Sequence, residues 1–261
     1  MRKPICFMLV VWILTGVSGI TFAQDAPAEK GAFDKSNFSA TLALTSDYVF
    51  RGISYTDGDP AVQGSFDYAH PNGIYLGIWA TNWKDWDPNG SDIETDFYVG
   101  YSGDLDPFNY DFSAYYYHYP GANDDDAEYD YVEFIVKLKY QLAVALSPAI
   151  GIGYAYSPEY SGEDGASNYV NGTLDLTLPL NLTLGFEIGY QDIEGDKSTG
   201  NGWGLNGGNG YDYTHWRIGL STELKGFGLD VSYHNTDERV WLSDNIGPAD
   251  ERVVLTVSRS F

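Results

Sequence analysis

Strict alternation of apolar and polar residues is the feature that most constrains the fold of this chain. Apolar side chains occupy every second position over 38–45, 92–101 and 182–191. A period of two places them all on one face of an extended segment, and no comparably long stretch beyond residue 23 shows the 3.6-residue period of a helix. The alternation therefore predicts an all-β protein.

Twelve such segments can be placed, with ends set to within about two to four residues. They cover 38–50, 61–69, 74–82, 92–101, 108–118, 129–139, 143–156, 166–178, 182–192, 211–223, 227–234 and 251–261. An even number is what a barrel with both termini on one side requires, and most segments are near the roughly 9–11 residues that a tilted strand needs to cross a bilayer.

The connections between these segments alternate in length. Short links fall at 70–73, 102–107, 140–142, 179–181 and 224–226, and long polar links at 51–60, 83–91, 119–128, 157–165, 193–210 and 235–250. Transmembrane barrels have tight periplasmic turns and longer outward loops, whereas a soluble sandwich has no reason for this regularity. We therefore predict a single transmembrane antiparallel β-barrel of about twelve strands over 38–261.

In a membrane barrel the apolar face points to lipid and the charged residues point to the lumen. So many ionised groups would be prohibitive in a dry soluble core. The strand parity predicts these pore-lining residues, with Arg51 near the outer mouth: Asp47, Arg51, Asp67, Glu94, Asp96, Asp111, Glu133, Asp175, Glu187 and Arg217. Further charges on the same face are Glu223, Asp230, Lys137, Lys139 and Arg252.

The lumen of such a barrel is narrow. Twelve strands about 4.8 Å apart and tilted about 40° give a backbone cylinder roughly 24–25 Å across, and inward side chains leave on the order of 12 Å at most. A narrow pore and a plugged barrel both fit this estimate.

The N-terminus has the layout of a secretory signal peptide. Arg2 and Lys3 precede an apolar stretch over 5–20, and Thr21 and Ala23 supply small residues before a cleavage point at Gln24. An uncleaved anchor is the alternative, but the stretch is short for a spanning helix. We expect cleavage after residue 23, a periplasmic leader over 24–37 and insertion in the bacterial outer membrane.

Composition excludes several classes of function. The single cysteine lies within the signal peptide, so the mature chain has no disulfide, iron–sulfur cluster or thiol catalysis. The formal charge of −23 becomes −25 on cleavage, which argues against nucleic-acid binding. The 22 Tyr, 13 Phe and 7 Trp exclude a disordered acidic protein. The terminal aromatic Phe261 is typical of outer-membrane proteins, and we expect the outer-membrane assembly machinery to recognise it.

Three sequence patterns resemble binding sites. Asp85, Asp87, Asn89 and Asp96 match ligand positions of a calcium loop, but flanking strands and ordinary turn chemistry argue against Ca²⁺, and we expect no other cofactor. The acidic run over 123–130 is a solvated loop or a bridge to lipopolysaccharide through divalent cations. The GxGxxG pattern over 202–207 lacks the flanking strand and helix of a dinucleotide site.

Catalysis is not expected. Among the four histidines only His215 is placed on an inner face where it could serve as a base, and no serine forms a recognisable motif with it. A hydrolytic barrel is therefore the weaker interpretation.

The opening of the mature chain resembles a known family. The motif SDYVFRGIS over 46–54, DPAVQGS over 59–65 and GIYLGIWATN over 73–82 are similar to TorF-type putative porins, a family of small proteobacterial outer-membrane proteins. The match covers roughly the first third of the mature chain. The resemblance implies an outer-membrane barrel and supplies no catalytic residues.

The sequence thus predicts a porin-like channel for passive diffusion of small hydrophilic solutes, biased toward cations by its carboxylates. The alternative is a closed barrel that serves as a surface scaffold, binding ligands through the loops over 193–210 and 235–250. Outer-membrane lipid and lipopolysaccharide are the expected surroundings of either, and the sequence does not determine the oligomeric state.

Overall fold

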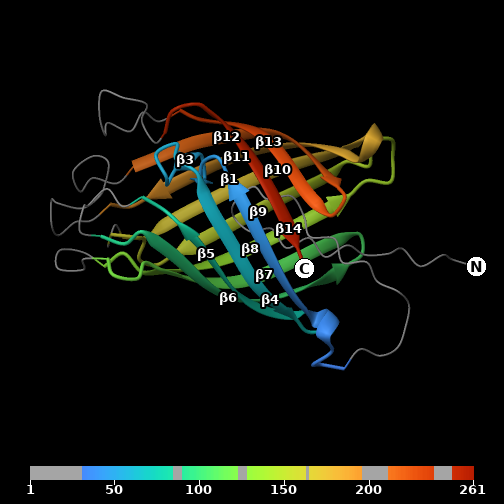
Figure 1. The fold of residues 1–261 in the computed structure, drawn as a ribbon, viewed down its shortest axis with the longest axis horizontal. Coiled ribbons are helices and arrows are strands. Elements are labelled where there is room, and N and C mark those ends of the chain that lie inside the picture. Colours follow the sequence, from blue (N-terminus) through green and yellow to red (C-terminus); the bar gives the residue numbers. More distant parts are fainter. Residues whose placement is uncertain (1–30, 85–89, 123–127, 163–164, 196–210, 238–248) are drawn as a thin grey trace, which may run out of the picture.

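Twelve antiparallel strands close into a barrel in the computed structural model of this chain, which describes residues 31–84, 90–122, 128–162, 165–195, 211–237 and 249–261 (Figure 1). The barrel strands are β1 (Phe38–Thr45), β4 (Ala61–Ala69), β5 (Ile74–Asn82), β6 (Ile93–Leu105), β7 (Phe108–His118), β8 (Tyr131–Gln141), β9 (Ala149–Ser157), β10 (Ser167–Leu178), β11 (Leu182–Ile193), β12 (Tyr211–Leu224), β13 (Phe227–Thr236) and β14 (Arg252–Ser260). The predicted fold is confirmed.

The first and last strands join to complete the cylinder. β1 pairs with β4 on one side and with β14 on the other, where Thr41 lies opposite Ser260. Their hydroxyl oxygens are 3.0 Å apart. Closure leaves no strand edge unpaired, which is the condition for crossing hydrocarbon.

The strand ends that lead into the tight turns and those that lead into the long connections form opposite ends of the cylinder. Strand ends that lead into the tight turns lie to the right in Figure 1, and those that lead into the long connections lie to the left. Lys225 and Gly226, at φ 54° and 79°, make a two-residue link between β12 and β13. Positive φ at both positions matches the right-handed twist of the flanking strands.

Most strand bounds lie within two to four residues of the sequence prediction, but β6 continues to Leu105, so the predicted link over 102–107 is reduced to residues 106–107, and β9 starts late. β9 begins at Ala149 rather than at residue 143. Residues 142–148 form a wider turn, closed by the Leu142 N–H donating to the Pro148 carbonyl at 2.8 Å. Two short 3₁₀ segments, η1 (Lys35–Asn37) and η2 (Pro179–Asn181), complete the regular structure at this end. In the described part of the chain no helix is long and apolar enough to cross a membrane.

The outward face of the barrel is apolar. Leu44, Ile188 and Leu255 expose 56–59% of their surface, while the residues beside them in sequence point inward and are buried or half-buried. Every barrel strand exposes large aliphatic or aromatic side chains in this way, which marks a lipid-facing surface. Near the C-terminus, Arg259 also faces outward, with its guanidinium 5.3 Å from the Phe261 ring, as a long side chain at the membrane interface can do.

The first long connection folds into the lumen. The predicted strand over 38–50 is wrong at its end, because β1 stops at Thr45 and residues 46–60 turn inward. There they form a small hairpin of β2 (Val49–Phe50) and β3 (Ile53–Ser54). Its side chains are buried, as the 1–4% exposure of Tyr48, Phe50 and Thr56 shows. We call residues 46–60 the inward hairpin. The burial of this hairpin overturns the prediction of an outward loop for 51–56, whereas residues 57–60 are exposed.

Glycine allows the hairpin to lie against the wall. Gly52 follows Arg51 at the tip, and the two have φ of 83° and 48°. A Cβ on Gly52 would lie 2.6 Å from the Cβ of His215 on β12. Only a residue without a side chain fits this left-handed, close-packed position.

Candidate functional site: the lumen and its inward hairpin

Arg51 anchors the inward hairpin across the lumen. Its Nη2 lies 2.7 Å from Glu133 Oε2 on β8, and its Nη1 donates to Gln191 Oε1 on β11 at 2.8 Å. The guanidinium also lies 4.0 Å from the centre of the Tyr169 ring. The Arg51 and Glu133 side chains are 1% and 0% exposed. A guanidinium suits this position because it pairs with a carboxylate and stacks on a ring at once.

The structure corrects the expected partner of Arg51. The sequence predicts a position near the outer mouth, bridging lumenal carboxylates such as Asp47, whereas Arg51 is buried between the outer ends of β8 and β11 and pairs with Glu133. Gln191, its other partner, lies on the polar side of the predicted alternation. That parity places it inward, but nothing local in the sequence indicates the contact with residue 51.

Asp47 holds the base of the inward hairpin. It accepts hydrogen bonds from the hydroxyls of Ser54 and Thr56 at 2.6 and 2.8 Å. Its second oxygen lies 2.6 Å from Nη1 of Arg252 on β14. Thr45 Oγ1 donates to the Asp47 carbonyl at 2.8 Å. The hairpin is therefore tied both to itself and to the wall where the barrel closes.

Aromatic rings fill the lumen around the hairpin. The Tyr48 ring lies 5.6 Å from Trp79 of β5, and the Phe50 ring lies 6.2 Å from Tyr117 of β7. Tyr117 in turn stacks on Tyr131 of β8 at 4.3 Å. These contacts make a packed core inside the barrel, so the outer half of the lumen is largely occluded.

Two carboxylates on β6 stand apart from the ion pairs. Glu94 and Asp96 are 2% and 6% exposed and lie beside each other on the lumenal face. Tyr48 Oη donates to Glu94 Oε1 at 3.0 Å. Among the described residues, Glu94 Oε2 and Asp96 Oδ1 have no hydrogen-bond partner, and neither residue forms an ion pair.

The half of the lumen nearer the tight turns is less tightly packed. Lys139 Nζ lies 3.2 Å from Asp175 Oδ2, and Arg217 Nη2 lies 2.7 Å from Asp230 Oδ2. The Lys139 and Asp175 side chains keep 25% and 19% of their surface exposed. The remaining predicted lining residues also lie on this inner face, where tyrosine hydroxyls or an asparagine amide donate to them: Asp67, Asp111 and Glu187. All ten predicted residues therefore lie in the lumen.

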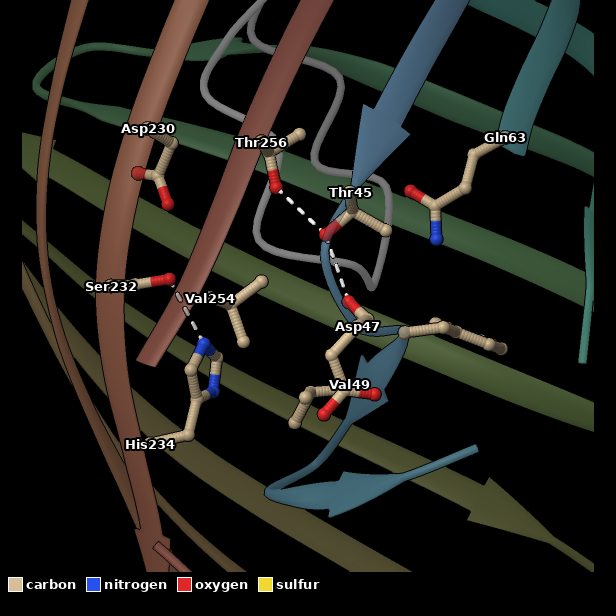
Figure 2. A pocket seen from close by; sticks show the side chains of 10 residues that line it. Thr45, Asp47, Val49, Gln63, Asp230, Ser232, His234, Val254 and Thr256 are labelled. Atoms are coloured by element: carbon tan, nitrogen blue, oxygen red, sulfur yellow. Dashed lines mark hydrogen bonds between the residues drawn. The ribbon is translucent and has the colours of Figure 1, made fainter. Parts of the chain in front are cut away.

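A small cavity lies between the inward hairpin and the wall near the barrel seam (Figure 2). Its volume of about 20 Å³ is room for roughly one water molecule. It is lined by Thr45, Asp47, Tyr48, Val49, Gln63, Asp230, Ser232, His234, Val254 and Thr256. The Ser232 hydroxyl lies 3.0 Å from His234 Nε2, a pair that the sequence analysis did not single out. A space of this size does not admit an organic substrate.

His215 contacts a tyrosine on the lumenal face of the barrel. Its Nε2 lies 2.9 Å from the Tyr169 hydroxyl, and the two rings stack at 5.7 Å. The same hydroxyl is 3.0 Å from Glu187 Oε1. No serine in the described residues forms a hydrogen bond with His215, so the predicted base has no serine nucleophile beside it.

At the outer rim, Asp130 joins the ends of β7 and β8. The Tyr116 hydroxyl and the Tyr119 backbone N–H donate to its carboxylate, and His118 Nδ1 contacts it. Partial burial opposes ionisation of Asp130, but these hydrogen bonds outweigh it and hold the pKa of Asp130 below its ordinary value.

Several predicted features fall outside the described residues. These are the signal peptide and most of the leader (1–30), the acidic run at 123–127, the glycines at 202–207, most of the two longest loops (196–210 and 238–248) and three of the four calcium-loop residues, Asp85, Asp87 and Asn89. The fourth, Asp96, lies in the lumen on β6. In the described part of the chain, no three His, Cys, Asp or Glu side chains are grouped to hold a metal ion.

A closed cylinder with an apolar exterior, a charged interior and an inward-folded first loop defines a twelve-stranded transmembrane β-barrel protein. The chain belongs to the family described as "Bacterial protein of unknown function (Gcw_chp)", whose model matches residues 28–261. The resemblance to TorF-type putative porins remains a prediction. Comparison with curated protein sequences finds no match.

Solved structures with the same fold are outer-membrane channels. The KdgM porin has a TM-score of 0.54 at 12% identity, covering 85% of this chain and 99% of its own. The NanC porin gives 0.54 at 12%, covering 86% and 98%. An outer membrane channel from Pseudomonas putida F1 gives 0.52 at 11%, covering 91% and 100%. At such low identity, these likenesses establish the fold.

Proposed function

We propose that this protein is a narrow outer-membrane channel for passive diffusion of small hydrophilic solutes, with a bias toward cations. The observation that carries the proposal is the lumenal charge. Nine buried or half-buried carboxyl groups face the described lumen against five cationic side chains, a formal excess of four acidic groups. An excess of one sign within low-dielectric walls concentrates ions of the other sign.

The inward hairpin sets the constriction of this channel. It occupies the outer half of the lumen, where Arg51 is neutralised by Glu133 and cannot repel cations as a free charge would. Solutes that pass this level must be small, because the rings of the hairpin and wall are in contact. The half nearer the tight turns, with its exposed Lys139 and Asp175, forms a wider vestibule.

Planar-bilayer recording of the purified protein tests the proposal. We expect small conductance steps and, in a salt gradient, a reversal potential that favours cations. Absence of steps from protein shown to be folded, or a reversal potential that favours anions, contradicts it. Liposome swelling with sugars and amino acids of increasing size then measures the largest solute that the channel admits.

Placement in the outer membrane belongs to the same proposal. The fold of outer-membrane channels and the predicted export signal support it, and Phe261 at the end of β14 is the residue we expect the assembly machinery to recognise. Fractionation of cells on a sucrose gradient checks it: recovery with the inner membrane, or in the soluble fraction, contradicts it.

A further inference from the structure

We infer that Glu94 and Asp96 form a binding site for one monovalent cation at the constriction. The site deepens the proposed function, on which its role in permeation rests. Two buried carboxylates, each with an oxygen lacking a hydrogen-bond partner among the described residues, provide the starting observation.

The burial of these groups requires a compensating charge. A carboxylate removed from water is costly unless a cation or strong hydrogen bonds replace its hydration. The other buried carboxylates at this level have such partners, since Asp47 pairs with Arg252 and Glu133 with Arg51. Glu94 accepts a hydrogen bond from Tyr48 and is within hydrogen-bonding reach of Tyr119 and Asp96, but neither carboxyl group has a cationic partner among the described residues. The Glu94–Asp96 pair therefore lacks the cation that every comparable group beside it has.

The surroundings favour a cation over any other ligand. Asp96 lies directly between Trp79 on β5 and Tyr117 on β7 in the strand register, and all three face the lumen. The faces of aromatic rings attract cations. The pair lies beside Glu133, whose one unbonded oxygen adds to the negative potential.

The charge and geometry point to a monovalent ion. No third carboxylate or histidine in the described residues comes close enough to complete a metal site, so Ca²⁺ or Mg²⁺ would lack the oxygen ligands that it requires. Two carboxylate oxygens together with aromatic faces match a weakly hydrated ion such as K⁺ or Rb⁺. Weak binding of such an ion lets it both enter and leave the site, which conduction requires.

Anomalous diffraction from crystals of the full-length mature protein in rubidium chloride tests the site directly. We expect a rubidium peak in contact with Glu94 Oε2 and Asp96 Oδ1, absent from the Glu94→Gln/Asp96→Asn variant. Absence of a peak at these oxygens in the wild-type protein overturns the inference, because two carboxyl groups that only share a proton bind no rubidium. This measurement requires no conductance, so it stands apart from the channel proposal.

Reversal potentials then measure the role of the site. Each unit charge lost within about 10 Å of the path is worth about tenfold in ion partition, so the double variant, which removes two carboxylates, should lower the cation-to-anion permeability ratio by at least about tenfold. Glu223→Gln, which removes one carboxylate at the exposed end of β12, is the control and should change the ratio less than twofold. If the wild-type protein conducts but the permeability ratio of the double variant is unchanged, the inference is overturned and the proposed function stands. If the wild-type protein shows no conductance but binds rubidium at these oxygens, the proposed function is overturned and the cation site stands.

Discussion

Removal of Arg51 should destabilise the barrel far more than removal of an exposed cation that pairs with the same hairpin. The Arg51→Met variant keeps much of the side-chain volume but leaves Glu133, 0% exposed, without its counter-charge at 2.7 Å. Breaking a buried ion pair by removing one partner costs about 3–5 kcal/mol. The variant also loses the hydrogen bond to Gln191 and the stacking on Tyr169.

A second substitution separates the ion pair from simple packing. The Arg51→Met/Glu133→Gln double variant removes the isolated charge together with its partner, and we expect it to regain at least about 2 kcal/mol of the loss. Lys84→Met is the control. Lys84 pairs with Asp57 of the same inward hairpin at 2.8 Å, but the two side chains are 48% and 31% exposed. Exposed pairs contribute about 0–1 kcal/mol.

Urea unfolding in lipid bilayers, followed by tryptophan fluorescence, gives these free energies. The same variants in planar bilayers should show larger conductance steps, because the hairpin is less firmly held in the lumen. The anchoring role of this ion pair is refuted if the free energy of unfolding of Arg51→Met is within about 1 kcal/mol of the wild-type value. It is also refuted if the double variant is no more stable than Arg51→Met.

Three further outcomes follow from the geometry, each measured by the same unfolding assay. Gly52→Ala should cost about 1–3 kcal/mol, because its φ is 83° and the new Cβ meets His215; equal stability would contradict the packing. Ile218→Arg, on the lipid face midway along β12, should cost about 2–4 kcal/mol, whereas Leu224→Arg at the turn should cost about 0–1, and equal costs would contradict the depth assignment. Asp130→Asn should destabilise the protein at pH 7. Because the folded-state pKa of Asp130 is lowered, its contribution is present above the unfolded value of about 3.9 and is lost as the pH falls through the folded value. A difference that persists unchanged in acid would contradict this.

The sequence alone determined the architecture. A period of two fixes which side chains share a face, and it does so locally, without knowledge of any partner strand. The bounds of β4, β5 and β7 and the inward placement of Glu94, Glu133 and similar residues follow from parity alone. The alternation of short and long links identified a membrane barrel for the same reason, since chain reach allows a two- to four-residue link only between neighbouring antiparallel strands.

The tertiary structure alone decided the course of residues 46–60. The alternation continues past Thr45 through Tyr48 and Phe50, so a longer strand and an inward hairpin look the same in sequence. The partners that draw the hairpin inward, Glu133 and Gln191, are 82 and 140 residues away from Arg51 along the chain. Only closure of the cylinder brings β8 and β11 within reach of one side chain. Contacts across a lumen depend on which strands face one another, and no local pattern carries that information.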